Sequence, residues 1–247
     1  MSDNWDFYFA QVDGHAASIF VDLGRAANAP DQSRSAMVHL RLYLRDPGPQ
    51  GLSSQSEFDE LSGVEDALTR LEAASGAVYV GRNTCAGTRD FYFYAPTAEG
   101  WSTQVDAFMR AFPAYRYECG GRADPRWSVY FDFLHPSEED LQRIRNRRVC
   151  DSLENHGDAL EVARPIDHFI YFSDEAARAA YAKAVTQLGC RIEEHLEPKD
   201  ADQRMGLRVT NVGVPSLAQI DALTLPLWRL AREHGGDYDG WGCLAVK

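Results

Sequence analysis

The order of strand and helix signals in the second half of the chain restricts its fold more than any other feature. After residue 164, the hydrophobic patterns follow the order strand, helix, two strands, helix, strand. The helical runs have apolar residues at helical spacing and end at glycines, whereas the strand runs alternate apolar and polar residues or are aromatic. This order is typical of a ferredoxin-like unit, in which two helices cover one face of an antiparallel sheet. We expect strands at 166–172, 190–195 and 207–212, a helix between Ser173 and Gly189, a long helix at 216–234, and a last strand through Trp241 and Val246.

Two helical details belong to this half. A further helix is expected ahead of the unit, from about Ser137 to His156. The long helix contains Pro226, which removes a backbone donor. We therefore expect that helix to kink or break near Ala222.

Residues 37–119 can be read in the same order. The run 37–44 alternates and places Val38, Leu40 and Leu42 on one face, and a helix follows from the N-cap Ser56 to Gly76. Strands at 77–81 and 89–94, a short helix ending at Pro113, and strands at 115–119 and 127–133 complete this half. A hairpin at 5–23 precedes them. We expect an α+β protein of two tandem ferredoxin-like units, with domains at 1–134 and 135–247.

The charge balance limits the partners. The 247 residues include 37 acidic and 25 basic side chains, for a net charge of −12, and both halves are acidic. Neither half supplies the positive field that non-specific nucleic-acid binding requires. An acidic surface instead attracts basic protein partners. We expect a protein partner and no direct nucleic acid.

Cysteine usage and apolar runs indicate a cytoplasmic protein. The five cysteines are odd in number and form no C-x-x-C pair, which fits reduced thiols better than a disulfide framework or a zinc knuckle. The longest apolar runs are far shorter than a membrane span of about 20 residues. The polar, acidic start from Met1 to Asp6 does not resemble a secretory signal, so neither export nor membrane insertion is expected.

The sequence contains no catalytic constellation. The segment 81–87 lacks the lysine of a phosphate-binding loop and lies between two strands, so it reads as a hairpin loop. His168 follows Asp167 on an expected central strand, where adjacent side chains point to opposite faces and cannot pair as acid and base. A packed histidine is the favoured interpretation of His168. We expect no enzyme, no catalytic residues, no metal site and no cofactor.

Two polar clusters could contact a partner. Arg143, Arg147 and Arg148 lie on the expected helix 137–156, either as a solvated charge ladder or as a possible basic docking patch. The closing stretch 235–242 combines four glycines with Asp237, Tyr238, Asp239 and Trp241. It can form a bulged strand with Trp241 packed under the helices, or an acidic and aromatic recognition edge.

The second half also resembles a known family. The run 167–172 (Asp-His-Phe-Ile-Tyr-Phe), the helix ending in Leu188-Gly189 and the closing stretch 233–242 are similar to the regulator of ribonuclease activity B (RraB) family, and 136–148 resembles a leader helix of its longer members. The first half resembles a bacterial family of unknown function, through 80–82 (Val-Gly-Arg) and 91–94 (Phe-Tyr-Phe-Tyr).

The RraB resemblance implies a ferredoxin-like, non-catalytic protein that binds and restrains ribonuclease E. We therefore expect an acidic regulator that inhibits a nuclease by contact, with Asp237, Tyr238, Asp239 and Trp241 in the partner-binding surface. An immunity-type inhibitor of a basic nuclease is a close variant. The alternative is an enzyme or small-ligand module in the first half, with a pocket between 81–87 and 91–94.

Overall fold

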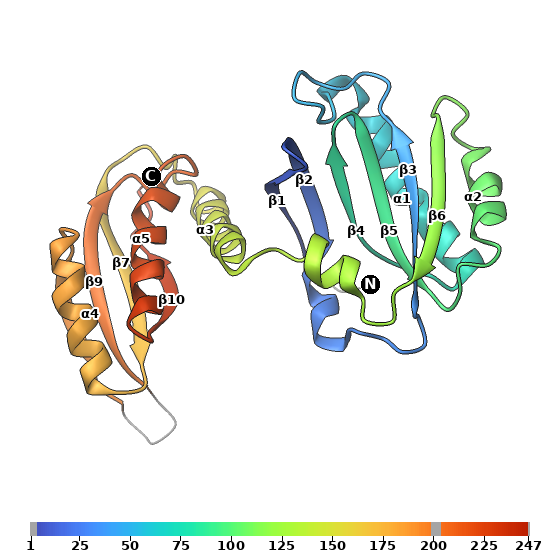
Figure 1. Cartoon of the computed structure of the whole chain (residues 1–247). Coiled ribbons are helices and arrows are strands. Elements are labelled where there is room, and N and C mark those ends of the chain that lie inside the picture. The colour runs from blue at the N-terminus through green and yellow to red at the C-terminus, as the bar shows by residue number, and fades with distance from the viewer. Residues whose placement is uncertain (1–3, 199–203, 247) are drawn as a thin grey trace. The chain divides into compact units, whose positions relative to one another are not determined.

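The computed structural model describes residues 4–198 and 204–246, and the chain divides into two compact units. Unit 1 comprises residues 1–136 and unit 2 comprises residues 137–247. Each unit contains one antiparallel sheet with helices against it (Figure 1). No helix in the described ranges is both long enough and apolar enough to cross a membrane.

Unit 2 has the ferredoxin-like topology. Its sheet has the order β10-β7-β9-β8, and every neighbouring pair is antiparallel. The expected βαββαβ order is therefore confirmed. In chain order the elements are β7 (Arg164–Phe172), α4 (Glu175–Gln187), β8 (Arg191–Leu196), β9 (Met205–Gly213), α5 (Ile220–Glu233) and β10 (Asp237–Gly242).

The alternation of buried and partly exposed residues along β7 shows which face of this sheet α4 and α5 cover. Residues 166, 168, 170 and 172 are buried, and those between them are partly exposed. Ile170 and Phe172 belong to one core cluster with Tyr181 of α4 and Leu227 of α5. The same face of β9 adds Leu207 and Val209 to this cluster. The opposite face of the sheet, which we call the open face, carries Asp167, Phe169 and Tyr171.

One further helix, α3 (Glu138–Asn155), precedes this fold. Ser137 caps it by accepting a hydrogen bond from the backbone N–H of Asp140 at 3.1 Å. It packs against α5 and β10, where Cys150 joins a second small cluster with Ile166, Ile220 and Trp241. The helix therefore lies beside the edge strand of the sheet (Figure 1).

Unit 1 repeats the same topology with an added hairpin. Its sheet has the order β1-β2-β4-β5-β3-β6, and β4-β5-β3-β6 is the ferredoxin-like order read from the other edge. The hairpin β1–β2 extends the sheet beyond β4. Besides three short helical turns, the elements are β1 (Trp5–Val12), β2 (His15–Asp22), β3 (Ala36–Tyr43), α1 (Phe58–Ser75), β4 (Val78–Cys85), β5 (Thr88–Ala95), α2 (Trp101–Met109) and β6 (Tyr117–Ala123).

The core of unit 1 lies between this sheet and helices α1 and α2. Val38, Leu40 and Leu42 are fully buried, as their alternation predicted, and they pack with Phe91 and Phe93 of β5. Leu61, Val64, Leu68 and Leu71 supply the apolar stripe of α1. The other face of the sheet is therefore free to hold polar side chains.

Three expectations about element boundaries were wrong. Residues 127–133 do not form a strand, because Asp124 accepts hydrogen bonds from the backbone N–H groups of Ser128 and Val129 and caps a π-helical turn, Val129–Leu134. The last strand ends at Gly242 rather than reaching Val246. Helix α5 starts at Ile220 rather than at Ser216, and it continues through Pro226 as one element, so of the two expected effects of the proline the break is excluded.

Candidate partner-binding surface

A β-bulge determines the direction of the side chains in the closing motif, which comprises Asp237, Tyr238, Asp239 and Trp241. Tyr238 and Trp241 are three residues apart, and on a regular strand they would point to opposite faces. In β10 the register with β7 shifts between Tyr238 and Gly240, so Asp239 is the additional residue. Gly240 has φ +153°, a conformation that side chains disfavour. The extra residue turns both aromatic rings toward the covered face.

Of the two alternatives for the closing stretch, the structure therefore favours the bulged strand with Trp241 packed inside, and the rings of Tyr238 and Trp241 do not form an open recognition edge. Tyr238 is 2% exposed and Trp241 is 7% exposed. In contrast to the two rings, the carboxylates of Asp237 and Asp239 are both exposed. Asp237 pairs with Arg204 at 2.9 Å.

Tyr238 belongs to a buried polar chain. Its hydroxyl lies 2.7 Å from Nδ1 of His168, and Nε2 of His168 lies 3.2 Å from Oδ1 of Asn211. Because the Asn211 oxygen only accepts, Nε2 carries the proton and Nδ1 accepts from Tyr238. Burial lowers the pKa of His168 to about 4, so the ring is neutral. His168 is a satisfied core histidine, and Asp167 on the open face pairs with Thr210 and Arg208 instead.

Trp241 connects the motif to α3. Its indole N–H donates to Oδ1 of Asn146 at 3.1 Å, and Gln142 donates to the same oxygen at 3.0 Å. The Asn146 amide nitrogen donates to Asp221 and Thr224 of α5, each at 2.7 Å. Asn146 is fully buried, and its hydrogen bonds link α3, α5 and β10 at one point.

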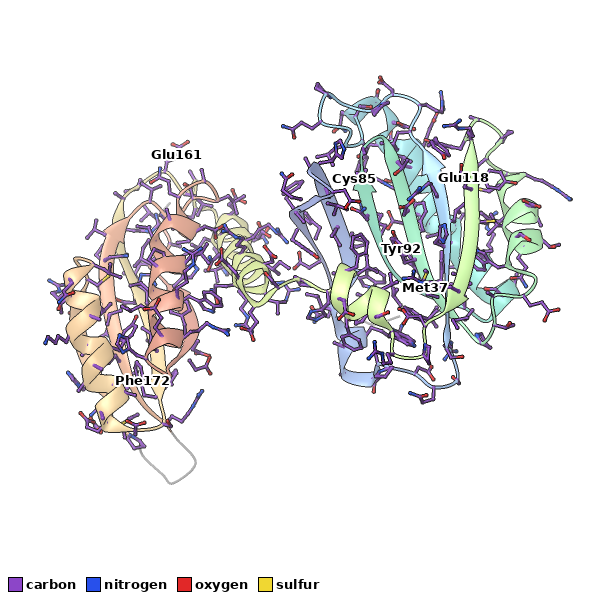
Figure 2. The ribbon with its side chains drawn as sticks, viewed as in Figure 1. Met37, Cys85, Tyr92, Glu118, Glu161 and Phe172 are labelled. Atoms are coloured by element: carbon purple, nitrogen blue, oxygen red, sulfur yellow. The ribbon has the colours of Figure 1, made fainter. Side chains whose placement is uncertain are left out.

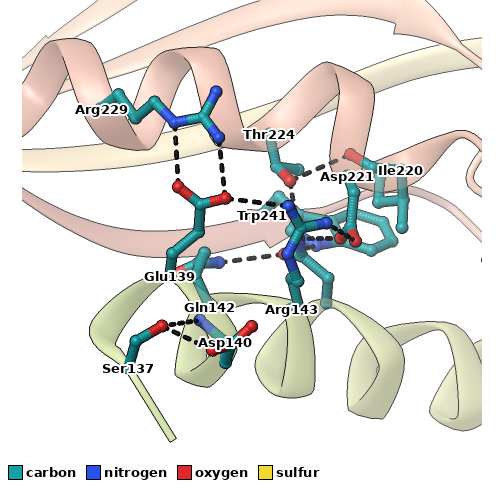
Figure 3. Close-up of polar contacts among 11 residues, drawn as sticks. Ser137, Glu139, Asp140, Gln142, Arg143, Ile220, Asp221, Thr224, Arg229 and Trp241 are labelled. Carbon is teal, nitrogen blue, oxygen red and sulfur yellow. Dashed lines mark hydrogen bonds and ion pairs between the residues drawn. The ribbon is translucent and has the colours of Figure 1, made fainter. Parts of the chain in front are cut away.

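The three arginines of the possible basic patch, Arg143, Arg147 and Arg148, lie in different environments. Arg143 lies 2.8 Å from both Glu139 and Asp221, so its guanidinium forms ion pairs within unit 2, and the pair with Glu139 is one step of the expected charge ladder (Figure 3). Arg147 is partly exposed and Arg148 is exposed. The three arginines therefore do not act as one free basic surface.

Arg148 and the closing motif meet at a groove between α3 and β10. The groove has a volume of about 360 Å³. Its walls combine aromatic, basic and acidic groups, so it can hold a side chain of a partner protein. The lining residues are Gln142, Arg145, Asn146, Arg148, Val149, Phe169, Asp239, Gly240 and Trp241.

The open face of the sheet continues this surface with more acids. Arg208 lies 3.4 Å from Asp167 and 3.2 Å from Glu194, so two carboxylates share one guanidinium. Tyr171 lies under the guanidinium of Arg204, 5.7 Å from the ring centroid. We call the set Asp167, Phe169, Tyr171, Glu194, Asp237 and Asp239, together with the α3–β10 groove, the acidic–aromatic surface.

Sequence reasoning missed Phe169, Tyr171 and Asn146. Successive side chains of a strand point to opposite faces, so Phe169 and Tyr171 lie on the same face as Asp167, and that position along the strand could have identified both. Asn146 follows Gln142 by four residues on α3, which marks a polar stripe but not its buried partners. Among residues 4–198 and 204–246, no group of three or more His, Cys, Asp or Glu side chains is placed to hold a metal ion.

Comparison with known proteins finds a matching family model for each unit. Residues 143–243 match the model of the regulator of ribonuclease activity B, RraB, as the resemblance predicted. Residues 3–135 match DUF695, a family of unknown function. A search of curated proteins finds no match to the chain.

Solved structures add no argument about the fold. One match is titled "Crystal Structure of an Unknown Protein from Galdieria sulphuraria", with 13% identity over 85% of this chain and 99% of that one. Its TM-score is 0.23. The chain belongs to the DUF695 family of unknown function, through a match that covers more than half of its length, and continues into an RraB-like domain.

Proposed function

We propose that the protein is a non-catalytic cytoplasmic regulator that binds a ribonuclease, with ribonuclease E as the first candidate, and inhibits it by contact. The observation that carries the proposal is the match of residues 143–243 to a regulator of ribonuclease activity. Inhibition by contact requires a surface and no reacting group. The acidic–aromatic surface of unit 2 is our candidate for that surface.

Charge and shape support this choice of surface. Asp237, Asp239 and Glu194 are exposed; Asp237 and Glu194 form ion pairs with arginines of the same surface, whereas Asp239 forms none among the described residues. Acids at a rim raise the association rate with a basic partner and make it sensitive to salt. Phe169 and Trp241 line the groove beside these acids, and aromatic groups in a pocket are the usual anchors of an interface.

A paired set of charge variants tests the proposal. The full chain is added to purified ribonuclease E, and both the dissociation constant and the rate of RNA cleavage are measured. We expect inhibition by the wild type, and for D237N/D239N an affinity lower by about fivefold, mainly through slower association. The matched control is E154Q/E161Q, which changes the net charge equally. Glu161 precedes β7 at one end of the sheet, whereas Asp237 pairs with Tyr171 near the other end.

Several outcomes would contradict the proposal. Absence of both binding and inhibition removes ribonuclease E as the target. An equal loss of affinity in the two double variants means that binding depends on the net charge of the protein and not on this surface. Equally tight inhibition of an unrelated basic nuclease favours the immunity-type variant over a ribonuclease E regulator.

A further inference from the structure

The second face of the unit 1 sheet holds a pocket that the proposed function does not use. Alternation along β3 directs Val38, Leu40 and Leu42 toward α1 and α2, so Met37, His39 and Arg41 point to the other face. The pocket on that face has a volume of about 310 Å³, at the lower end of the range for small-molecule sites. Figure 2 labels Met37 and Tyr92 in this region. The lining residues are Met37, His39, Arg41, Asp90, Tyr92, Arg122, Val129 and Phe133.

A strained segment holds one wall of this pocket. Trp127 has φ +56°, which is rare for a bulky residue, and its ring stacks on Tyr94 with centroids 4.0 Å apart. The Tyr94 hydroxyl donates to Asp124 at 2.6 Å, and the same carboxylate caps the π-helical turn. That turn carries Val129 and Phe133 onto the sheet. Backbone strain and π-helical turns are concentrated at functional sites.

The acid in the pocket is already neutralised. Arg41 donates to both oxygens of Asp90, at 2.6 and 2.8 Å, and the Tyr92 hydroxyl donates to the same carboxylate at 3.3 Å. Such a bidentate pair is strong and fixed in geometry. Asp90 therefore has little capacity left for a ligand, and its charge cancels that of Arg41.

Two polar groups of the lining have no such partner. Within the described residues, the His39 ring forms no hydrogen bond, and Arg122 forms neither a hydrogen bond nor an ion pair with its side chain. Burial lowers the pKa of His39, which keeps the ring neutral with one N–H to donate. Gly120 leaves room for this ring, because a Cβ at that position would lie 3.0 Å from Cε1 of His39.

The lining therefore has one net positive charge, one free imidazole and an apolar wall. We propose that this pocket binds a small organic monocarboxylate, whose carboxylate pairs with Arg122 and accepts from His39 while its apolar part packs against Met37, Val129 and Phe133. A single charge matches the single unpaired guanidinium. A phosphate dianion would bring a second charge that this lining does not neutralise.

A titration of the full chain tests this assignment with phenylacetate as the probe. Chemical shifts of the His39 ring and of the Gly120 amide report binding at the site. We expect a saturable response to phenylacetate, about tenfold weaker binding of the uncharged phenylacetamide, and weaker binding still of inorganic phosphate. R122Q lowers the affinity for phenylacetate about tenfold. Because Arg122 is exposed, this variant keeps its fold.

The control is R110Q, which makes the same charge change next to α2 at an exposed position. We expect it to bind phenylacetate as the wild type does. No saturable response, equal binding of phenylacetamide, or equal affinity in R122Q overturns the proposal. Tighter binding of phosphate than of phenylacetate overturns the assignment of a carboxylate.

Discussion

Unit 1 and unit 2 have the same inner strand order, but among residues 4–198 and 204–246 only those of unit 1 form a structured cover over part of the second face of the sheet. In unit 1 the segment after β6 turns back over the sheet, with Tyr130 donating to the Asp22 carbonyl at 2.7 Å. In unit 2 the corresponding face carries the exposed acids and arginines of the acidic–aromatic surface. A covered face can enclose a pocket, whereas an open charged face suits a macromolecule. One topology can therefore serve both kinds of binding that we propose.

The largest expected effect tests whether the cover stabilises unit 1. Trp127 is 1% exposed, and its indole N–H donates to the Arg34 carbonyl at 2.8 Å. We expect W127A to cost about 4 kcal/mol of unfolding free energy, as for other large core truncations. Hydrogen exchange measured residue by residue separates the units, and the loss of protection should fall on β3 and β5 and spare β7 and β9.

F131A is the matched control for this prediction, because Phe131 lies on the π-helical turn that follows Trp127 and is 36% exposed. It should cost less than about 1 kcal/mol. An equal cost in the two variants, or a loss of protection shared by both units, would mean that the cover is not a stabilising part of unit 1.

The second prediction uses pH to perturb unit 2. His168 titrates near 6.5 when unfolded and at about 4 in the fold, because burial opposes its charge. Between pH 6.5 and about 4, His168 binds a proton in the unfolded state but not in the native state. The free energy of unfolding therefore falls as the pH falls through this range, and the loss due to His168 is complete below about pH 4. The total is about 3 kcal/mol at roughly 1.4 kcal/mol per pH unit. Urea unfolding across this range should show a steeper slope for the wild type than for H168Q, and identical slopes would contradict the assignment.

The third prediction concerns the point where α3 joins unit 2. N146A leaves the indole N–H of Trp241 and the amide of Gln142 without their acceptor inside the fold. We expect a loss of about 2 kcal/mol, the usual cost of an unsatisfied buried polar group. The control is N155A, at an exposed position on the same helix, with an effect below about 0.5 kcal/mol. A cost for N146A as small as that for N155A would show that α3 is not anchored through Asn146.

Sequence patterns were sufficient for the topology because each strand and helix has its own local signal. The run 166–172 is rich in β-branched and aromatic residues, and β7 differs from the expected strand only by starting two residues earlier. The element order then fixed the ferredoxin-like arrangement of unit 2.

Features that depend on distant residues were not predictable in the same way. Trp127, Val129, Phe131 and Phe133 alternate as a strand does, but Asp124 and Tyr94 impose a π-helical turn. The direction of Trp241 depends on a bulge whose position the glycines suggest without fixing it. The unit 1 pocket is lined by residues of β3, β5, β6 and this turn, so no single sequence motif predicts it.

The smallest expected effect comes from the exposed ion pairs of α3, which we compare with its buried contact through Asn146. Glu139 accepts from Arg229 and Arg143, and these contacts lower the pKa of its carboxyl group. The arginines are about half exposed, so solvent screens both ion pairs. E139Q should therefore cost less than about 1 kcal/mol, and this cost should shrink further in high salt. Urea unfolding of E139Q beside N146A makes the comparison. If E139Q costs more than N146A, the ion pairs rather than Asn146 hold α3 against α5.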